Sequence, residues 1–297
     1  MCFCWTYSDG ACSSLESSNW NVGSHMKSSI AVGGRRLVNA CRVSLGSVPT
    51  FASAPAVVAQ LLVEPLLNAF FYLLLAFAAS GGEAPDRLTA AALAATVGAA
   101  SSKSLEVSTN LFMVDRYEGT LPHIFSASTG TGVLYAARTL CSTVLGMGTS
   151  FFMVLILSMA GALPSLEFED IPSLIIVLFL CCLASSVLGL VIYTVSLTST
   201  DELLVLNICM FALPIACGSV AAVSSYPHPI SELCSLIPIS DLTEAGRLIA
   251  LGSQAEAMLH ATKAFALVLV WLAAAAAILR IGAKRQRETG RFDMLGI

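Results

Sequence analysis

The sequence predicts an all-α integral membrane protein with six transmembrane helices, an N-terminal amphipathic interfacial helix, and a re-entrant helical hairpin before the last span. Three observations lead to this fold class. Of the 297 residues, 56% are hydrophobic and only 11% are charged, whereas about 25% of a typical soluble domain is charged. Several apolar runs reach the roughly 20 residues that a membrane-crossing helix needs. Lysines and arginines cluster before the first run and after the last.

The six predicted spans differ in how apolar they are. The second is weak because it is rich in Ala, Ser and Thr and also carries Lys103 and Glu106. Together the spans form one membrane domain over residues 51–287. In chain order we predict them at 56–79, 88–114, 133–163, 171–196, 203–223 and 264–282.

Positive charge predicts the orientation, because basic residues near the ends of spans mark the cytoplasmic side. Both termini are therefore expected in the cytoplasm of a multi-pass protein of the cell (plasma) membrane. Two cytoplasmic termini require an even number of spans, which favours keeping the weak second span. The basic residues before the first span and after the last are Lys27, Arg35, Arg36 and Arg42, and Lys284, Arg285, Arg287 and Arg291.

Three segments lie outside the membrane domain. Residues 1–26 are rich in Ser, Asn and Cys and are expected to be poorly ordered. Gly23-Ser24-His25-Met26 is similar to the remnant of a cloning tag, so a native and a tag-derived origin both stay open. Residues 27–50 are predicted to form an amphipathic helix on the inner leaflet, although Gly33-Gly34 also allows a flexible basic lead-in. Residues 288–297 are predicted to form a cytoplasmic tail.

A charged, turn-forming segment follows the second span, at 115–130. A polar segment between two spans has to reach water, and the orientation places this one in the cytoplasm. It is either a docking segment or an ordinary solvated loop. It begins with Asp115-Arg116-Tyr117-Glu118-Gly119-Thr120-Leu121-Pro122-His123.

Charged residues inside the predicted spans are candidates for function, because a charge in hydrocarbon is costly. Glu64-Pro65 interrupts the first span, and a proline there kinks the helix. Lys103 and Glu106 lie three residues apart in the second span, so they share a helix face and can pair. For each of these residues, a structural ion pair or hydrogen bond and a place on a substrate path are both open.

Residues 224–263 form a long outward segment before the last span. Its two amphipathic pieces, 230–240 and 241–249, are too short to cross the membrane and meet at Pro238. A hairpin that dips into the outer leaflet fits this pattern.

The chain lacks the motifs of several functional classes. It has no GxSxG, HExxH or GxxxxGK[ST] sequence, and its ten cysteines show no metal-binding spacing. A net charge of −4 gives no basic surface for nucleic acid. We therefore expect a protein that is no enzyme by itself and binds no metal or cofactor directly.

These features resemble the membrane subunit of an ABC-2 type exporter, the permease family that includes drug, polysaccharide and lipid exporters. The resemblance covers about residues 30–287 and rests on the order of the elements. Two patches are also similar in sequence. Residues 115–121 look like the family's charged, Gly-Thr-Leu segment, and residues 236–247 look like its proline-centred stretch ending in Glu, Ala and Arg.

The resemblance implies a transmembrane subunit that forms a substrate path as a dimer, in contact with membrane lipid. Its partners would be a second identical or related permease and two cytoplasmic ATPase subunits, which would bind the ATP and Mg. Loop 115–130 would form the coupling helix, with residues 27–50 as the connecting helix beside it. The implied coupling residues are Asp115, Arg116, Glu118, Gly119, Leu121, Ile124 and Phe125; the substrate path would use Glu64, Lys103, Glu106 and Asn207, and the outer gate Pro238, Glu244 and Arg247.

Two other classes stay open. A six-span secondary transporter or channel that is not coupled to ATP is the first, although such transporters commonly contain two related halves and no repeat is visible between the first three and last three spans. A membrane scaffold without transport is the second. The substrate, and the choice between a homodimer and a heterodimer of permeases, stay open as well.

Overall fold

The computed structural model describes residues 34, 37–48, 53–80, 85–120, 131–163, 166–196, 202–219 and 221–289. The chain divides into two units, Met1–Arg36 and Leu37–Ile297, and of the first unit only Gly34 is described. The predictions for residues 1–26, for Leu121, Ile124 and Phe125, and for most of the tail at 288–297 therefore lie outside the described residues.

Among the described residues the second unit is helical, without a β-strand. A continuous helical stretch at its start combines α2 (Ala54–Val58), the π-helical segment η2 (Ala59–Val63) and α3 (Glu64–Ser80). Each predicted span overlaps one helix or, for the first span, this continuous stretch, but the bounds differ at several ends. The remaining helices are α4 (Pro85–Tyr117), α6 (Thr131–Met159), η3 (Phe168–Asp170), α7 (Ile171–Ser196), α8 (Glu202–Ala216), η4 (Val223–Ser225), α9 (His228–Cys234), α10 (Pro238–Ala250) and α11 (Gln254–Thr289).

The apolar helices indicate a membrane protein. Three described segments, Gly132–Met159, Phe168–Tyr193 and Gln254–Ile281, are long and apolar enough to cross a bilayer, and Leu204–Ala216 is a shorter apolar helix. The helix at this last position ends earlier than the predicted span 203–223. Its 15 residues correspond to about 22 Å of rise, against a hydrocarbon core of about 30 Å.

A glycine cap explains the early end of α8. Gly218 has a φ of 76°, a left-handed conformation that glycine adopts without steric cost. Its amide donates to the carbonyl of Ile215 at 3.0 Å, and the next amide, of Ser219, donates to the carbonyl of Pro214 at 3.0 Å. These are the two hydrogen bonds of a Schellman motif, so the chain turns away after Ala216 although apolar residues follow.

Helix α4 lies at the centre of the bundle and packs against α3, α6, α7, α8 and α10. Its polar side chains Ser101, Ser104, Ser108 and Thr109 are fully buried. The Ser108 hydroxyl donates to the carbonyl of Ser186 at 2.8 Å, and Thr109 donates to the carbonyl of Leu105 at 2.8 Å. The polar residues that make the second predicted span weakly apolar are thus buried against other helices.

Small residues let α4 approach its neighbours closely, as is common between membrane helices. A Cβ added at Gly189 of α7 would lie 2.8 Å from the Ser108 Cβ and 3.2 Å from the Leu105 carbonyl oxygen. One added at Gly146 of α6 would lie 1.8 Å from the Ser104 Oγ. Glycine at these two positions therefore sets the distance between α4 and both neighbouring helices.

Within residues 27–50, where an amphipathic helix was predicted, the structure is helical at residues 37–46. Its contacting face carries Cys41, Ser44 and Val48, which pack against α4 and α6. The apolar side chains of Val38 and Leu45 are exposed. The Ser44 hydroxyl donates to the Ala40 carbonyl at 2.8 Å, so Ser44 is buried without an unpaired polar group.

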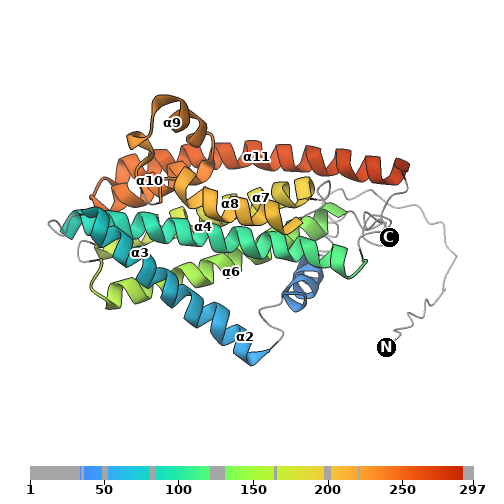
Figure 1. Ribbon diagram of the computed structural model, residues 1–297, viewed down its shortest axis with the longest axis horizontal. Coiled ribbons are helices and arrows are strands. Elements are labelled where there is room, and N and C mark those ends of the chain that lie inside the picture. Colours follow the sequence, from blue (N-terminus) through green and yellow to red (C-terminus); the bar gives the residue numbers. More distant parts are fainter. Residues whose placement is uncertain are drawn as a thin grey trace, which may run out of the picture. The chain divides into compact units, whose positions relative to one another are not determined.

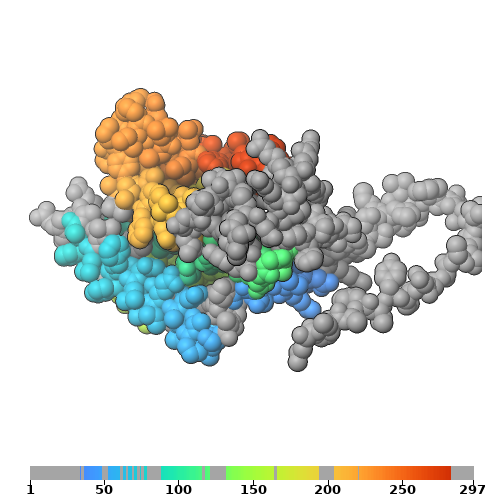
Figure 2. Space-filling view, turned by 45° about the vertical axis from the view of Figure 1, so that its right-hand side comes forward, coloured from blue at the N-terminus to red at the C-terminus, as the bar shows by residue number. Residues whose placement is uncertain are grey.

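The two short helices before the last long helix occur where the hairpin was predicted. Helix α10 packs against α4, α7 and α11, and its Ile239, Leu242 and Ile249 are fully buried. Helix α9 is exposed, and its segment forms a raised lobe in Figure 2. In Figure 1, α9 and α10 lie at one end of the bundle, and the C-terminal ends of α4 and α11 lie at the other.

Candidate functional site

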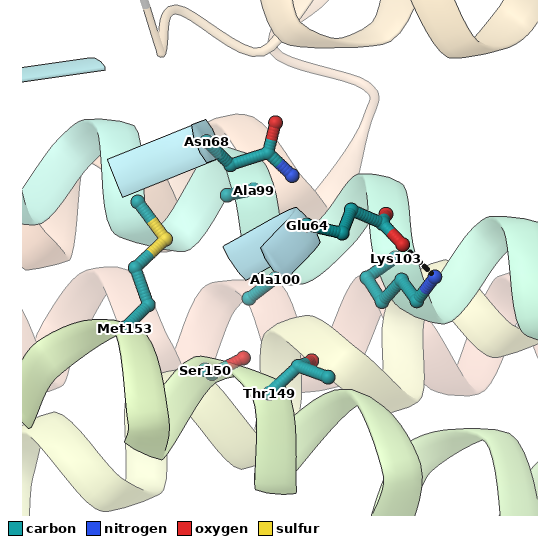
Figure 3. A pocket seen from close by; sticks show the side chains of 8 residues that line it. All are labelled: Glu64, Asn68, Ala99, Ala100, Lys103, Thr149, Ser150 and Met153. Atoms are coloured by element: carbon teal, nitrogen blue, oxygen red, sulfur yellow. Dashed lines mark hydrogen bonds and ion pairs between the residues drawn. The ribbon is translucent and has the colours of Figure 1, made fainter. Parts of the chain in front are cut away.

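Three charged side chains meet between α3 and α4, within the apolar part of the bundle. The Lys103 ammonium donates to the Glu64 carboxylate at 2.7 Å and to the Glu106 carboxylate at 3.2 Å. Figure 3 shows Glu64 and Lys103 pointing toward each other from their two helices. We call Glu64, Lys103 and Glu106 the open triad, because its two carboxylates remain partly exposed.

The exposed fractions divide the open triad into an inner and an outer part. The Lys103 side chain is 10% exposed, whereas Glu64 is 36% and Glu106 is 31% exposed. The lysine is therefore the buried counter-ion, and the carboxylates form the accessible surface. This arrangement is the reverse of a lysine that extends its ammonium to solvent while burying its stem.

An irregular turn positions Glu64. The π-helical segment ends at Val63, and Glu64 is the first residue of α3. Pro65 has no backbone N–H, so the carbonyl four residues earlier loses its α-helical donor. A single widened turn of this kind is a common feature of functional sites. A π-helical segment thus precedes Glu64-Pro65, where the sequence predicts a kink.

A small pocket adjoins the open triad. Besides Glu64 and Lys103, its walls are formed by Asn68 of α3, Ala99 and Ala100 of α4, and Thr149, Ser150 and Met153 of α6 (Figure 3). Its volume is about 20 Å³, and ~10–15 Å³ is enough for one water molecule. The pocket accordingly admits one water-sized group, such as an ammonium, in this conformation.

A second ion pair on α4 is closed to solvent. The Arg138 guanidinium of α6 donates to both carboxylate oxygens of Asp115, with 2.7 Å between Nη2 and Oδ1. The side chains are 4% and 8% exposed. The guanidinium also lies over the Phe112 ring, 5.8 Å from its centroid. We call Asp115 and Arg138 the sealed pair.

The sealed pair changes the expected role of Asp115. The sequence placed this residue in a cytoplasmic loop, where its carboxylate would be available to a partner. In the structure α4 continues to Tyr117, so Asp115 lies in its last turn and is paired inside the chain. Asp115 is held inside the chain because Arg138 on α6 offers two aligned donors, and α4 extends far enough for Asp115 to reach them.

The loop itself starts at a glycine cap. Gly119 has a φ of 66°, and the amide of Thr120 donates to the Asp115 carbonyl at 2.9 Å, which is the longer bond of a Schellman motif. Glu118 and Gly119 are exposed at this turn. Arg116, another predicted coupling residue, lies on α4, and its side chain is outside what the structure describes.

The predicted outer gate residues lie on α10 and are tied to neighbouring elements. Pro238 is the first residue of α10. Arg247 donates to Glu244 at 3.0 Å and also to the carbonyl of Gly218, just beyond α8. Arg247 therefore joins α10 to the end of α8 and satisfies an acceptor of the Gly218 turn.

The same region holds an ion cluster that the sequence did not reveal. The buried Asp241 accepts at one oxygen from His260 at 3.0 Å and from Lys263 at 2.9 Å. Both partners lie on α11, so the cluster fastens α10 to that helix. Nearby, Tyr226 donates to the Ile215 carbonyl at 2.7 Å, and burial raises the pKa of its hydroxyl.

The structure gathers only part of the predicted substrate path. Glu64, Lys103 and Glu106 come together, but Asn207 is exposed on α8 and does not line the pocket. Asn68 was missed, although it follows Glu64 by four residues and so shares its helix face. Thr149 and Ser150 carried no such signal, because only the packing of α6 brings them to the pocket.

The described residues contain no group of three His, Cys, Asp or Glu side chains that could hold a metal ion. No protein-family model matches the chain, and no curated protein matches it. The residues of the open triad offer ion pairing and hydrogen bonding.

Proposed function

We propose that the chain is the transmembrane subunit of an ATP-driven ABC exporter. The observation that supports this most is the order of elements: a packed lead-in helix, a series of long helices, and two short helices, α9 and α10, immediately before the last one. The ABC-2 resemblance implies this order. Six spans, two cytoplasmic termini, a place in the cell membrane and a permease dimer belong to the same proposal.

In this proposal the open triad lies on the substrate path. Charged side chains inside a membrane bundle are costly and mark paths for substrates or ions. The triad combines such charges with a pocket and with partly exposed carboxylates. The paired helices α9 and α10 would cover the outer end of the path, with Arg247 holding them to α8.

The loop after α4 would receive the movement of two separate ATPase subunits, which carry the ATP and Mg. Glu118 is exposed at its start, and the sealed pair joins the helix before the loop to the helix after it. A force on the loop would therefore move α4 and α6 together, because a buried two-point ion pair resists sliding between them.

The coupling role is tested by replacing Glu118 and Phe125 together with alanine in the complex isolated from native membranes. We expect ATP hydrolysis to continue while ATP-dependent export in vesicles is lost. Glu169→Ala is the matched control, since Glu169 is an exposed acid in η3. Export by the double variant at the wild-type rate per ATP would reject the coupling role.

A cation-coupled secondary transporter is the second candidate. The observation in its favour is the acid–lysine–acid arrangement beside a water-sized pocket, since ionisable side chains in membrane helices also form proton and ion relays. Vesicle transport separates the two: a secondary transporter responds to an imposed ion gradient without ATP, and the exporter requires ATP without a gradient.

A further inference from the structure

The accessible surface of the open triad is negatively charged. Two carboxylates face one ammonium, so the triad carries one negative charge in excess, and the ammonium is its buried member. A ligand that approaches from the exposed side meets Glu64 and Glu106 before it meets Lys103. The charge and the burial together favour a cation and disfavour an anion.

Each carboxylate also has an acceptor to spare. Lys103 contacts Oε2 of Glu64 and Oε2 of Glu106. Within the part of the chain that the structure describes, the Oε1 atoms of both residues have no hydrogen bond. Of the two carboxylates only Glu64 lines the pocket, and the Asn68 side-chain amide, which also lines it, adds one more acceptor there. A group with several N–H donors could use the acceptors of Glu64 and Asn68 without displacing Lys103.

The size of the pocket restricts the cationic group. About 20 Å³ accommodates one water-sized group, and a primary ammonium has about that size and three N–H donors. A quaternary ammonium is larger and has no donor. The pocket therefore favours a primary ammonium over a quaternary one.

An apolar surface adjoins the carboxylates. On α3, Leu67 and Phe71 follow Glu64 by three and seven residues and so lie on its helix face. Their side chains are 62% and 60% exposed, and α3 lies on the face of the molecule seen in Figure 2. A ligand whose ammonium reaches Glu64 would lay an apolar chain along these two side chains.

We propose that the open triad binds amphiphilic primary amines, with the ammonium between Glu64 and Asn68, Glu106 offsetting the charge of Lys103, and the apolar chain along α3. Their role as the exported substrate class rests on the proposed function. The binding of the amine does not rest on the proposed function, because every side chain that contacts the amine lies on this chain. Anionic amphiphiles are excluded by the excess negative charge.

The test measures binding of octylamine, octanol, octanoate and octyltrimethylammonium to the full chain in lipid nanodiscs by calorimetry, with empty nanodiscs as the blank. We expect octylamine to bind at least tenfold more tightly than the other three. Glu64→Gln and Glu106→Gln should each weaken octylamine binding at least tenfold, and the control Glu169→Gln, at an exposed acid in η3, should leave it unchanged. Equal binding of octanoate, or unchanged octylamine binding in both Gln variants, would overturn the proposal.

Lys103→Met separates a ligand site from a structural ion pair. Removing the internal ammonium leaves both carboxylates to the ligand, so octylamine should bind more tightly in a variant that still unfolds cooperatively. Unchanged or weaker binding in that variant would also overturn the proposal. The assay needs no ATPase. If the chain binds octylamine but no ATPase co-purifies with it from native membranes, the exporter alone is rejected; if an ATPase co-purifies but the chain does not bind octylamine, the ligand class alone is rejected.

Discussion

Helix α4 carries two charge clusters of opposite character. The open triad around Lys103 has two carboxylates that are about one-third exposed, whereas the sealed pair of Asp115 and Arg138 is less than 10% exposed on both sides. Both clusters join α4 to a neighbouring helix. In the sealed pair both carboxylate oxygens of Asp115 accept from Arg138 inside the chain, while the open triad keeps acceptors unused. The sealed pair therefore suits a structural brace, and the open triad suits a ligand site.

The largest expected effect comes from breaking the sealed pair. Arg138→Leu would leave the Asp115 carboxylate buried without a counter-ion, which typically costs about 3–5 kcal/mol. The double variant Asp115→Leu with Arg138→Leu removes both charges and should recover most of that loss. Thermal unfolding in detergent of the wild type, the single variants Asp115→Leu and Arg138→Leu, and the double variant measures the coupling between the two sites.

The sealed pair would lose its role as a brace if the two single variants unfolded at the wild-type temperature. It would also lose that role if the double variant were less stable than either single variant.

An intermediate effect is expected where α4 packs against α7. Gly189→Ala brings a Cβ within 2.8 Å of the Ser108 Cβ, which should destabilise the bundle by about 1–3 kcal/mol because an added methyl in a close contact forces a backbone shift. Gly148→Ala on α6 is the matched control, since its added Cβ meets nothing within 4 Å. Equal unfolding temperatures for the two variants would contradict this close packing.

The smallest effect on stability is expected at the open triad. Glu106→Gln removes one partly exposed charge from the cluster and should change stability by less than ~1 kcal/mol, as for other ion pairs that reach solvent. The same chemical change at Asp115, Asp115→Asn, should lower the free energy of unfolding clearly more. If Glu106→Gln proved as damaging as Asp115→Asn in the same unfolding assay, the open triad would also be a structural element.

The helices were largely predictable because long apolar runs and basic flanks are local signals. The predicted span 171–196 matches α7 in both bounds, since η3 and a polar loop mark its start. The ends at Gly218 and Gly161 were missed: both residues have positive φ and lie inside apolar sequence, where a cap has no polar signature.

The candidate site was predictable only in part. Lys103 and Glu106 are local neighbours on one helix, so their pairing could be anticipated, but Glu64 joins them from 39 residues away. Asp115 was assigned to the loop because its local sequence is polar and turn-forming. Its partner Arg138 lies beyond the loop, and no spacing rule connects the two residues.

The central claim is that this chain works with a separate ATPase. The most direct measurement isolates the chain from native membranes in mild detergent and determines the molar ratio of every polypeptide that remains bound. The proposed function predicts an ATP-hydrolysing subunit in a one-to-one ratio with permease chains. A stable, transport-competent assembly that contains only this chain, or this chain with partners that hydrolyse no ATP, would contradict it.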